Sequence, residues 1–189
     1  MFFSKQNLSG FTLVEALIAM SILIVGVISG FLLVTKALYN VTIIQDRLTA
    51  SFLAQEGVEL IRQLRDTNFL QQLKGENIPW DSNEMLAHCK QDNEQDNGCL
   101  IWANPRTNQV ITSALDSVSS PQTLYYHPET GLYNYEPSDY PTTFKRIIHL
   151  SSISPNELKV QVEMTWQSKG MDFWFTVEDH LFNWLQAKV

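Results

Sequence analysis

The chain has 189 residues, of which 17% are charged, and a formal net charge of -7 at pH 7. This length allows one modest globular domain and an anchor, and the charged fraction lies below the roughly 25% of soluble domains. Residues 74–189 hold fifteen acidic and eight basic side chains, whereas residues 1–73 hold five of each. Because phosphate-backbone binding relies on clustered Lys and Arg, this acidic part argues against nucleic acid as a partner, although a small local basic patch is compatible with it.

The first ten residues are short and polar, and Lys5 with the amino terminus makes them weakly positive. Because positive flanks of a membrane segment tend to stay in the cytoplasm, we expect residues 1–10 inside and the residues after Val34 outside. A secretory signal has a shorter apolar core followed by a small-residue cleavage site. Lys36-Ala37-Leu38-Tyr39 does not supply such a site, so the apolar run is expected to stay with the protein.

An apolar run begins in the hexapeptide Gly10–Glu15 and lasts to Val34. The twenty residues from Ala16 to Thr35 carry no charge, which is enough for a helix to cross the ~30 Å hydrocarbon core. Glu15, at the entrance of the run, is a candidate functional residue because ionisable groups are costly in membrane segments. The alternative is a carboxylate near the interface that snorkels to water or is protonated.

Three glycines fall within this run and its continuation. Gly26 and Gly30 have the GxxxG spacing that permits close approach of two helices, but glycine is also common in membrane helices. Gly57 lies further along and is a weak point for a helix.

One helix is predicted from about Phe11 to near Phe69 or Leu73, a length on the order of 90 Å. Its second half is amphipathic, because apolar residues recur at steps of three and four, and it should pack against a domain. These residues are Leu38, Val41, Ile44, Leu48 and Phe52, followed by Leu53, Leu60, Ile61 and Leu64. The spacings Glu59–Arg62 and Arg62–Asp66 predict two ion pairs on its surface.

The stretch from Gly75 to about Ser120 is rich in Asn, Gln, Asp and Ser, and it predicts a long loop with at most one short strand. Asp92, Glu94 and Asp96 alternate there, which hints at calcium. Asn97 and Ala103 stand where a calcium loop of the EF-hand type needs glycine and an acid, so a solvated acidic loop fits better.

Two cysteines, Cys89 and Cys99, lie in this polar stretch. They are too few for a four-ligand zinc site, although His88 is adjacent to one of them. If the segment is exported, an even number of cysteines in a loop favours a disulfide. Two free thiols are the alternative.

The end of the chain has the pattern of an antiparallel sheet. Leu124–Tyr126 and Leu132–Tyr135 flank a glycine-containing turn, which predicts a hairpin. Phe144–Leu150 is a further strand candidate, and in Lys159–Trp166 and Met171–Val177 apolar residues alternate with polar ones. The turns before and between the last two are Ser154-Pro155-Asn156 and Ser168-Lys169-Gly170. The resulting three-stranded meander has one apolar face, which the long helix should cover, and Leu181, Trp184 and Leu185 suggest a short terminal helix or a tied-down tail.

No pattern of a catalytic or cofactor site is present. The sequence lacks GxSxG, Walker, HExxH and CxxC motifs, and His88, His127, His149 and His180 are scattered. The aromatic residues Trp166, Phe173, Trp174, Phe175 and Trp184 are interpreted as a sheet core and its rim, because a base-stacking platform also needs a positive groove. We therefore expect no enzyme, no cofactor and no metal.

The N-terminal residues Gly10-Phe11-Thr12-Leu13-Val14-Glu15-Ala16-Leu17-Ile18-Ala19 resemble the cleavage and methylation motif of type IV prepilins and type II secretion pseudopilins. The resemblance covers about the first twenty-five residues. It implies that a prepilin peptidase cuts between Gly10 and Phe11 and methylates the new Phe11 amine. Glu15 of a neighbouring subunit could then neutralise that amine in the filament.

The resemblance also implies an α+β, pilin-like fold. Its parts would be a cytoplasmic leader (1–10), a transmembrane and assembly helix (11–35), an amphipathic continuation (36–73) and an extracytoplasmic β-rich head (74–189). Val160–Trp166 and Leu181–Leu185 are similar to minor pilins of the pilus-modification type. The cysteine pair lies mid-chain and does not bracket a C-terminal loop, as it does in many major pilins.

The leading functional hypothesis is a structural subunit of a type IV pilus or type II secretion filament. Its partners would be the prepilin peptidase, other pilin or pseudopilin subunits and, before assembly, the bacterial inner membrane. The alternative is a filament-tip binding module for DNA, a surface or a secreted substrate. A membrane-anchored enzyme is a third class, for which the sequence offers no catalytic set.

Overall fold

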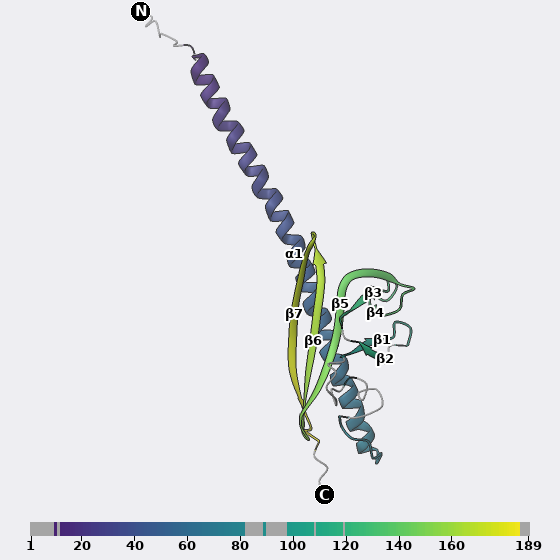
Figure 1. Cartoon of the computed structure of the whole chain (residues 1–189). Helices are drawn as coiled ribbons and strands as arrows, with labels where there is room; N and C mark the ends of the chain where they lie inside the picture. Colours follow the sequence, from purple (N-terminus) through teal and green to yellow (C-terminus); the bar gives the residue numbers. More distant parts are fainter. Residues whose placement is uncertain are drawn as a thin grey trace, which may run out of the picture. The chain divides into compact units, whose positions relative to one another are not determined.

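The computed structural model describes residues 10, 12–81, 89, 98–107, 109–118 and 120–185, with the side chains of 113–118 left aside. The chain divides into two compact units, Met1–Ile44 and Gln45–Val189, and each is considered by itself. In the described residues one helix is followed by strands that all pair antiparallel (Figure 1). The predicted α+β class is confirmed.

Helix α1 runs from Leu13 to Leu73 as one continuous element. This agrees with the predicted span to within the usual uncertainty of helix ends. Its C-terminus is closed by two reverse hydrogen bonds, from Gly75 N to Gln72 O (2.9 Å) and from Glu76 N to Gln71 O (3.1 Å). That pair of bonds is a Schellman motif. Gly75 has a φ of 91°, a left-handed conformation that favours glycine.

The C-terminal unit contains a seven-stranded sheet in which β5 is the central strand, paired with β1, β3 and β6. The strands are β1 (Gly98–Ala103), β2 (Val110–Val118), β3 (Gln122–Tyr126), β4 (Tyr133–Asn134), β5 (Tyr140–Ser154), β6 (Glu157–Ser168) and β7 (Met171–Phe182). The three long strands β5, β6 and β7 run side by side (Figure 1). The predicted hairpin corresponds to β3 and β4, in which Tyr125 pairs with Asn134.

The predicted meander of β5, β6 and β7 is confirmed. Along β6 every second residue from Leu158 to Ser168 is buried, as the period of two required. The β6–β7 connection is a two-residue turn in which Lys169 and Gly170 have φ angles of 51° and 78°, and Ser168 pairs with Met171 across it. Two positive φ angles are typical of the tight turns that suit the right-handed twist of a hairpin.

The prediction of a loop with at most one short strand between Gly75 and Ser120 is wrong, because β1 and β2 form a hairpin there. All six residues of β1 are buried, so β1 has no alternating pattern to detect. The connection between the strands contains an Asx turn, in which Arg106 N donates to Asn104 Oδ1 (2.8 Å). Asn104-Pro105 was the available turn signal.

The C-terminal half of α1 packs on the sheet through small residues. Ala50, Ala54 and Gly57 are buried, and a Cβ at Gly57 would lie 3.1 Å from Ile148 Cδ1 and 3.4 Å from Val162 Cγ1. Gly57 therefore permits close approach of the helix to β5 and β6. It was predicted only as a weak point of the helix.

The apolar stripe predicted for this half of α1 is only partly the packing face. Leu53, Leu60, Ile61 and Leu64 are buried, as expected. Leu38, Val41, Ile44, Leu48 and Phe52 are instead exposed in the single chain. The helix thus has more apolar surface than one sheet can cover.

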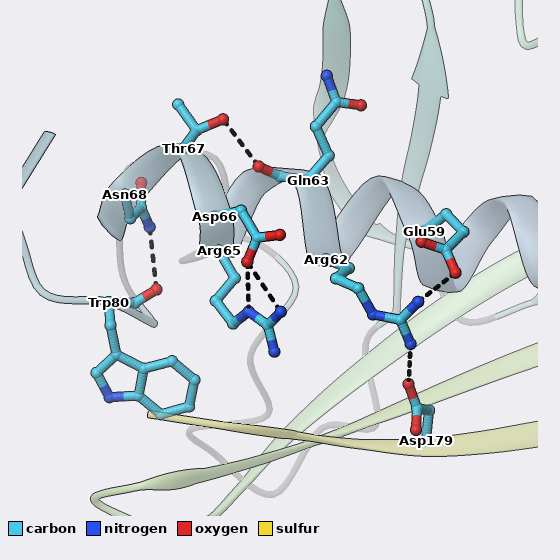
Figure 2. Close-up of polar contacts among 9 residues, drawn as sticks. All are labelled: Glu59, Arg62, Gln63, Arg65, Asp66, Thr67, Asn68, Trp80 and Asp179. Atoms are coloured by element: carbon cyan, nitrogen blue, oxygen red, sulfur yellow. Dashed lines mark hydrogen bonds and ion pairs between the residues drawn. The ribbon is translucent and has the colours of Figure 1, made fainter. Parts of the chain in front are cut away.

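Arg62 joins α1 to β7, as Figure 2 shows. The predicted pair with Glu59 is present, and a second bond runs from Arg62 Nη2 to Asp179 Oδ2 (2.8 Å). The predicted pair of Arg62 with Asp66 is wrong, because Asp66 binds Arg65 (2.8 Å) and Arg62 turns to the sheet. Burial lowers the pKa of Arg62, but Glu59 and Asp179 together raise it by more than burial lowers it. The net pKa of Arg62 therefore lies above the usual value.

The C-terminal residues form a tied-down tail, and the described part of this end, to Leu185, contains no helix. Asn183 N donates to Asn156 O (3.0 Å). The Trp184 ring packs edge-on against Phe69, with ring centroids 4.8 Å apart. Of the two alternatives for this end, the tail is the observed one.

Candidate processing and assembly segment

The N-terminal end of α1 is capped by Thr12, a residue that sequence reasoning did not single out. Glu15 N donates to Thr12 Oγ1 (3.3 Å), and Ala16 N donates to Thr12 O (3.1 Å). Thr12 is therefore the N-cap residue, and Glu15 is at the third helical position. The sequence Thr-x-x-Glu is that of a capping box, so the spacing inside the hexapeptide also marks where the helix begins.

Gly10 lies just outside the helix and is exposed, and a Cβ built on it would have no atom within 4 Å. Nothing in the described part of the chain thus requires glycine here for packing. Packing among the described residues would therefore tolerate a larger side chain at this position. Phe11, the other residue of the predicted cut, lies outside the described residues.

Glu15 is exposed and occupies the first turn of α1. An acid at this position is favoured by the partial positive charge of a helix N-terminus. Its backbone N–H is satisfied by Thr12, and its carboxylate oxygens make no hydrogen bond within the described residues. The side chain is therefore available to a group outside this chain.

The helix behind Glu15 presents apolar side chains all round. The large apolar residues between Leu13 and Val34 are 54% to 77% exposed. By length and composition α1 could cross a membrane. Ser21 Oγ and Thr35 Oγ1 donate to the carbonyls of Leu17 (2.7 Å) and Phe31 (2.9 Å), so both hydroxyls have partners even in apolar surroundings.

Gly26 and Gly30 leave open space on this helix, since a Cβ at either position would meet no atom within 4 Å. The space is consistent with close approach of a second helix. In a single chain the GxxxG pairing stays a prediction.

The largest buried polar group of the C-terminal unit is Arg146 of β5, which is fully buried. Its Nη1 donates to Leu53 O (2.7 Å) and Glu56 Oε2 (3.1 Å), and its Nη2 donates to Ile101 O (2.7 Å). Tyr135 Oη accepts from Arg146 Nε (3.4 Å) and donates to Arg146 O (3.1 Å). One side chain thus joins α1, β1 and β5.

The surroundings of Arg146 favour its protonated, positively charged form. Burial lowers the pKa of Arg146, but Tyr135 and Glu56 raise it more, and the net pKa is above the usual value. Burial also raises the pKa of Tyr135, more than Arg146 lowers it. Tyr135 is therefore neutral at pH 7, and Glu56 supplies the negative charge that Arg146 needs.

Cys89 and Cys99 form the favoured disulfide, with 4.9 Å between their Cα atoms. Both are buried. Cys99 pairs with Ile148 of β5, and Leu150 N donates to Cys89 O (3.0 Å). Both bridged cysteines thus contact the central strand β5 through their backbones.

Groups suited to metal binding or catalysis are dispersed in the part of the chain that the structure describes. No three His, Cys, Asp or Glu residues gather there as a metal site would need. His88 and the calcium candidates Asp92, Glu94 and Asp96 lie outside the described residues. His180 Nδ1 lies 2.7 Å from Glu157 Oε1, and this bond, followed by that to Glu178, raises the pKa of His180.

Comparison with family models matches residues 5–31 to the prokaryotic N-terminal methylation motif. This segment contains Gly10, Phe11, Thr12 and Glu15 and extends to Phe31 in α1. The chain thus carries the prepilin-type signature at its N-terminus. Comparison of the chain with curated proteins and with solved structures gives no match.

Proposed function

We propose that this chain is a minor pilin or pseudopilin, a structural subunit of a type IV pilus or type II secretion filament. The observation that carries the proposal is the methylation motif over residues 5–31, together with the helix that begins inside it at Leu13 and has exposed apolar side chains. The motif supports a structural role over an enzymatic one. The subunit would be held in the inner membrane, with residues 1–10 in the cytoplasm and the sheet outside.

In this proposal a prepilin peptidase cuts after Gly10 and methylates Phe11. The cut creates a positive amine one residue before the Thr12 cap. A positive charge next to the positive end of a helix is unfavourable, and in apolar surroundings an unpaired charge costs several kcal/mol. The exposed Glu15 of a neighbouring subunit would neutralise it, and this pairing would set the axial position of each subunit.

Substitution of Gly10 tests the processing step. We expect Gly10→Val to abolish leader removal in cells with an active prepilin peptidase. The chain itself leaves room for a side chain at Gly10, so a loss of cleavage would mean that the peptidase requires glycine at this position. Mass spectrometry of the isolated protein gives the N-terminus and its methylation. Gly26→Val is the matched control, since Gly26 is also unobstructed but lies within the helix. An intact leader on the wild-type protein in such cells would contradict the proposal.

Substitution of Glu15 tests the assembly step. Glu15→Ala keeps the Thr12 cap, because the cap accepts from the backbone of residue 15. We therefore expect normal cleavage but incorporation into filaments reduced by about tenfold or more, as loss of ~1.4 kcal/mol or more would give. Immunoblots of sheared filaments and of membranes compare the two pools. Normal incorporation would rule out the charge pairing.

A second candidate function is binding by the C-terminal unit, as at a filament tip. The observation that favours it is an open hollow on the outer face of β5, β6 and β7, which contains an exposed tryptophan. The acidic composition of residues 74–189 argues against DNA as the ligand of this unit.

A further inference from the structure

The face of β5, β6 and β7 that looks away from the core carries an open hollow of about 600 Å³. This volume is within the range of small-molecule sites, roughly 300–1,000 Å³. The hollow is lined by Thr142, Thr143, Lys145, Glu163, Thr165, Trp166, Gln167, Asp172, Phe173 and Trp174. It has no part in the proposed processing and assembly steps.

An indole stands at one side of this hollow. Trp174 is 75% exposed, while its neighbours Phe173 and Phe175 are half-buried and pack against Trp166. The prediction that Trp174 belongs to the sheet core or its rim is therefore wrong. The period of two of β7 turns Trp174 to the opposite face.

Trp174 is one member of a row across three strands. Lys145 of β5 pairs with Thr165 of β6, and Thr165 pairs with Trp174 of β7. Directly paired residues point to the same face of a sheet, and two strand spacings cover roughly 10 Å. The indole of Trp174 and the ammonium of Lys145 thus extend from positions two strands apart on the same face, with Thr165 at the position between them.

The polar groups around the row have capacity for a ligand. Among the described residues, the side chains of Thr143, Lys145, Thr165 and Glu163 make no hydrogen bond or ion pair with one another or with other side chains. Gln167 Nε2 donates to Asp172 Oδ1 (3.2 Å), and both residues line the hollow. The hollow therefore offers an ammonium, a carboxylate and two hydroxyls that only solvent now satisfies.

We propose that this hollow binds a neutral, β-linked pyranose oligosaccharide, stacked on Trp174 and hydrogen-bonded by Thr165, Lys145 and Glu163. A β-linked pyranose with equatorial hydroxyls has a flat face of C–H groups and a polar rim. The C–H face complements the negative face of an indole, and the rim meets donors and acceptors along the row. The site depends on the C-terminal unit alone and does not require cleavage or assembly.

The charges at the site favour a neutral ligand over the other classes. A phosphate-bearing polymer would meet one ammonium against two carboxylates, Glu163 and Asp172. A quaternary ammonium would meet the like charge of Lys145 and one aromatic ring where such sites use several. A protein partner would need a broader apolar surface, and among the lining residues Trp174 is the one exposed large apolar side chain.

The test uses the full chain in nanodiscs of phosphatidylethanolamine and phosphatidylglycerol, without glycoside detergents, which would compete. Cellotetraose and chitotetraose are titrated by isothermal calorimetry and by tryptophan emission, with α-linked maltotetraose as the comparison sugar. We expect binding of at least one β-linked sugar with a dissociation constant on the order of 1 mM or tighter, and weaker binding of maltotetraose. Which of the two binds shows whether the acetamido group is recognised.

Two variants assign the binding to this hollow. Trp174→Ala should weaken it by about tenfold or more, as removal of a stacking aromatic anchor does, and Thr165→Val should weaken it several-fold at an unchanged melting temperature. Trp184→Ala is the matched control, because Trp184 is also exposed (62%) but lies outside the hollow. Absence of binding of both β-linked sugars at about ten times the expected constant, equal binding of maltotetraose, or unchanged affinity of Trp174→Ala would each overturn the proposal.

Discussion

At the scale of single residues, Arg146 shows how a charge is tolerated in the core of the C-terminal unit. Its guanidinium donates to two backbone carbonyls, Leu53 O and Ile101 O, and to the Glu56 carboxylate. A buried charge is tolerated only when its donors have partners and an opposite charge is near. Arg146 meets both conditions, and its bonds join α1 and β1 to its own strand β5.

Removal of this group should be costly. We expect Arg146→Met to lower the free energy of unfolding by about 3–5 kcal/mol, because Glu56 and two buried carbonyls would lose their donor. Urea unfolding followed by tryptophan emission gives the change. Lys145→Met is the matched control, since Lys145 is the exposed cation next to it, and its cost should stay within about 0.5 kcal/mol. Equal stability of the two variants would refute the role of Arg146.

At the scale of elements, the contact of α1 with the sheet depends on small side chains. Ala50, Ala54 and Gly57 let the helix axis approach β5 and β6, and a Cβ at Gly57 would already be in tight contact with Ile148 and touch Val162. The close approach also brings the helix carbonyl of Leu53 within reach of Arg146. Packing and polar bonding therefore depend on the same helix position.

A larger residue at Gly57 should separate the two elements. We expect Gly57→Leu to destabilise the C-terminal unit by about 1–3 kcal/mol through overpacking, although leucine is the better helix former by up to about 1 kcal/mol. Thermal unfolding by circular dichroism measures the change. Gly26→Leu provides the control, because it makes the same propensity gain where nothing lies within 4 Å. A more stable Gly57→Leu variant would disprove the close approach.

The elements that could be predicted from sequence are those in which apolar residues recur at a regular spacing or whose ends are marked by turn residues. The alternation in β6 and β7 was visible because one face of these strands is buried, and α1 was visible because no proline or charge cluster interrupts it. The β1 strand has no alternation, since both of its faces are buried. The polar residues of β2 gave no apolar run to mark it as its partner.

The functional residues also fall into those that could be predicted from sequence and those that could not. Gly10, Phe11 and Glu15 belong to a short linear motif, so their spacing alone identifies them. Arg146 could not be found, because an arginine in a strand usually lies at the surface, and its acceptors lie 93 and 45 residues away along the chain. The Trp174 hollow likewise depends on strand register, which joins Lys145 to Thr165 and Thr165 to Trp174.

At the scale of the whole molecule, the C-terminal unit keeps apolar helix surface that its own sheet leaves open. Leu48 and Phe52 of α1 are 53% and 59% exposed, although they belong to the amphipathic stripe predicted to pack on the sheet. Scattered exposed apolar residues are common. Two on adjacent turns of one helix, in a chain with a prepilin-type signature, are instead expected to contact the helices of neighbouring subunits.

This expectation separates folding from assembly. Because Phe52 is exposed, Phe52→Glu should change the free energy of unfolding by no more than about 0.5 kcal/mol. In a filament the same carboxylate would be buried without a partner, at a cost of several kcal/mol, so incorporation should fall by roughly tenfold or more. Leu70→Glu is the matched control, since Leu70 is equally exposed (59%) on the same helix but five turns further from the apolar segment. Leader cleavage of both variants should be normal, and equal incorporation of Phe52→Glu and the wild-type chain would show that this part of α1 faces solvent in the filament.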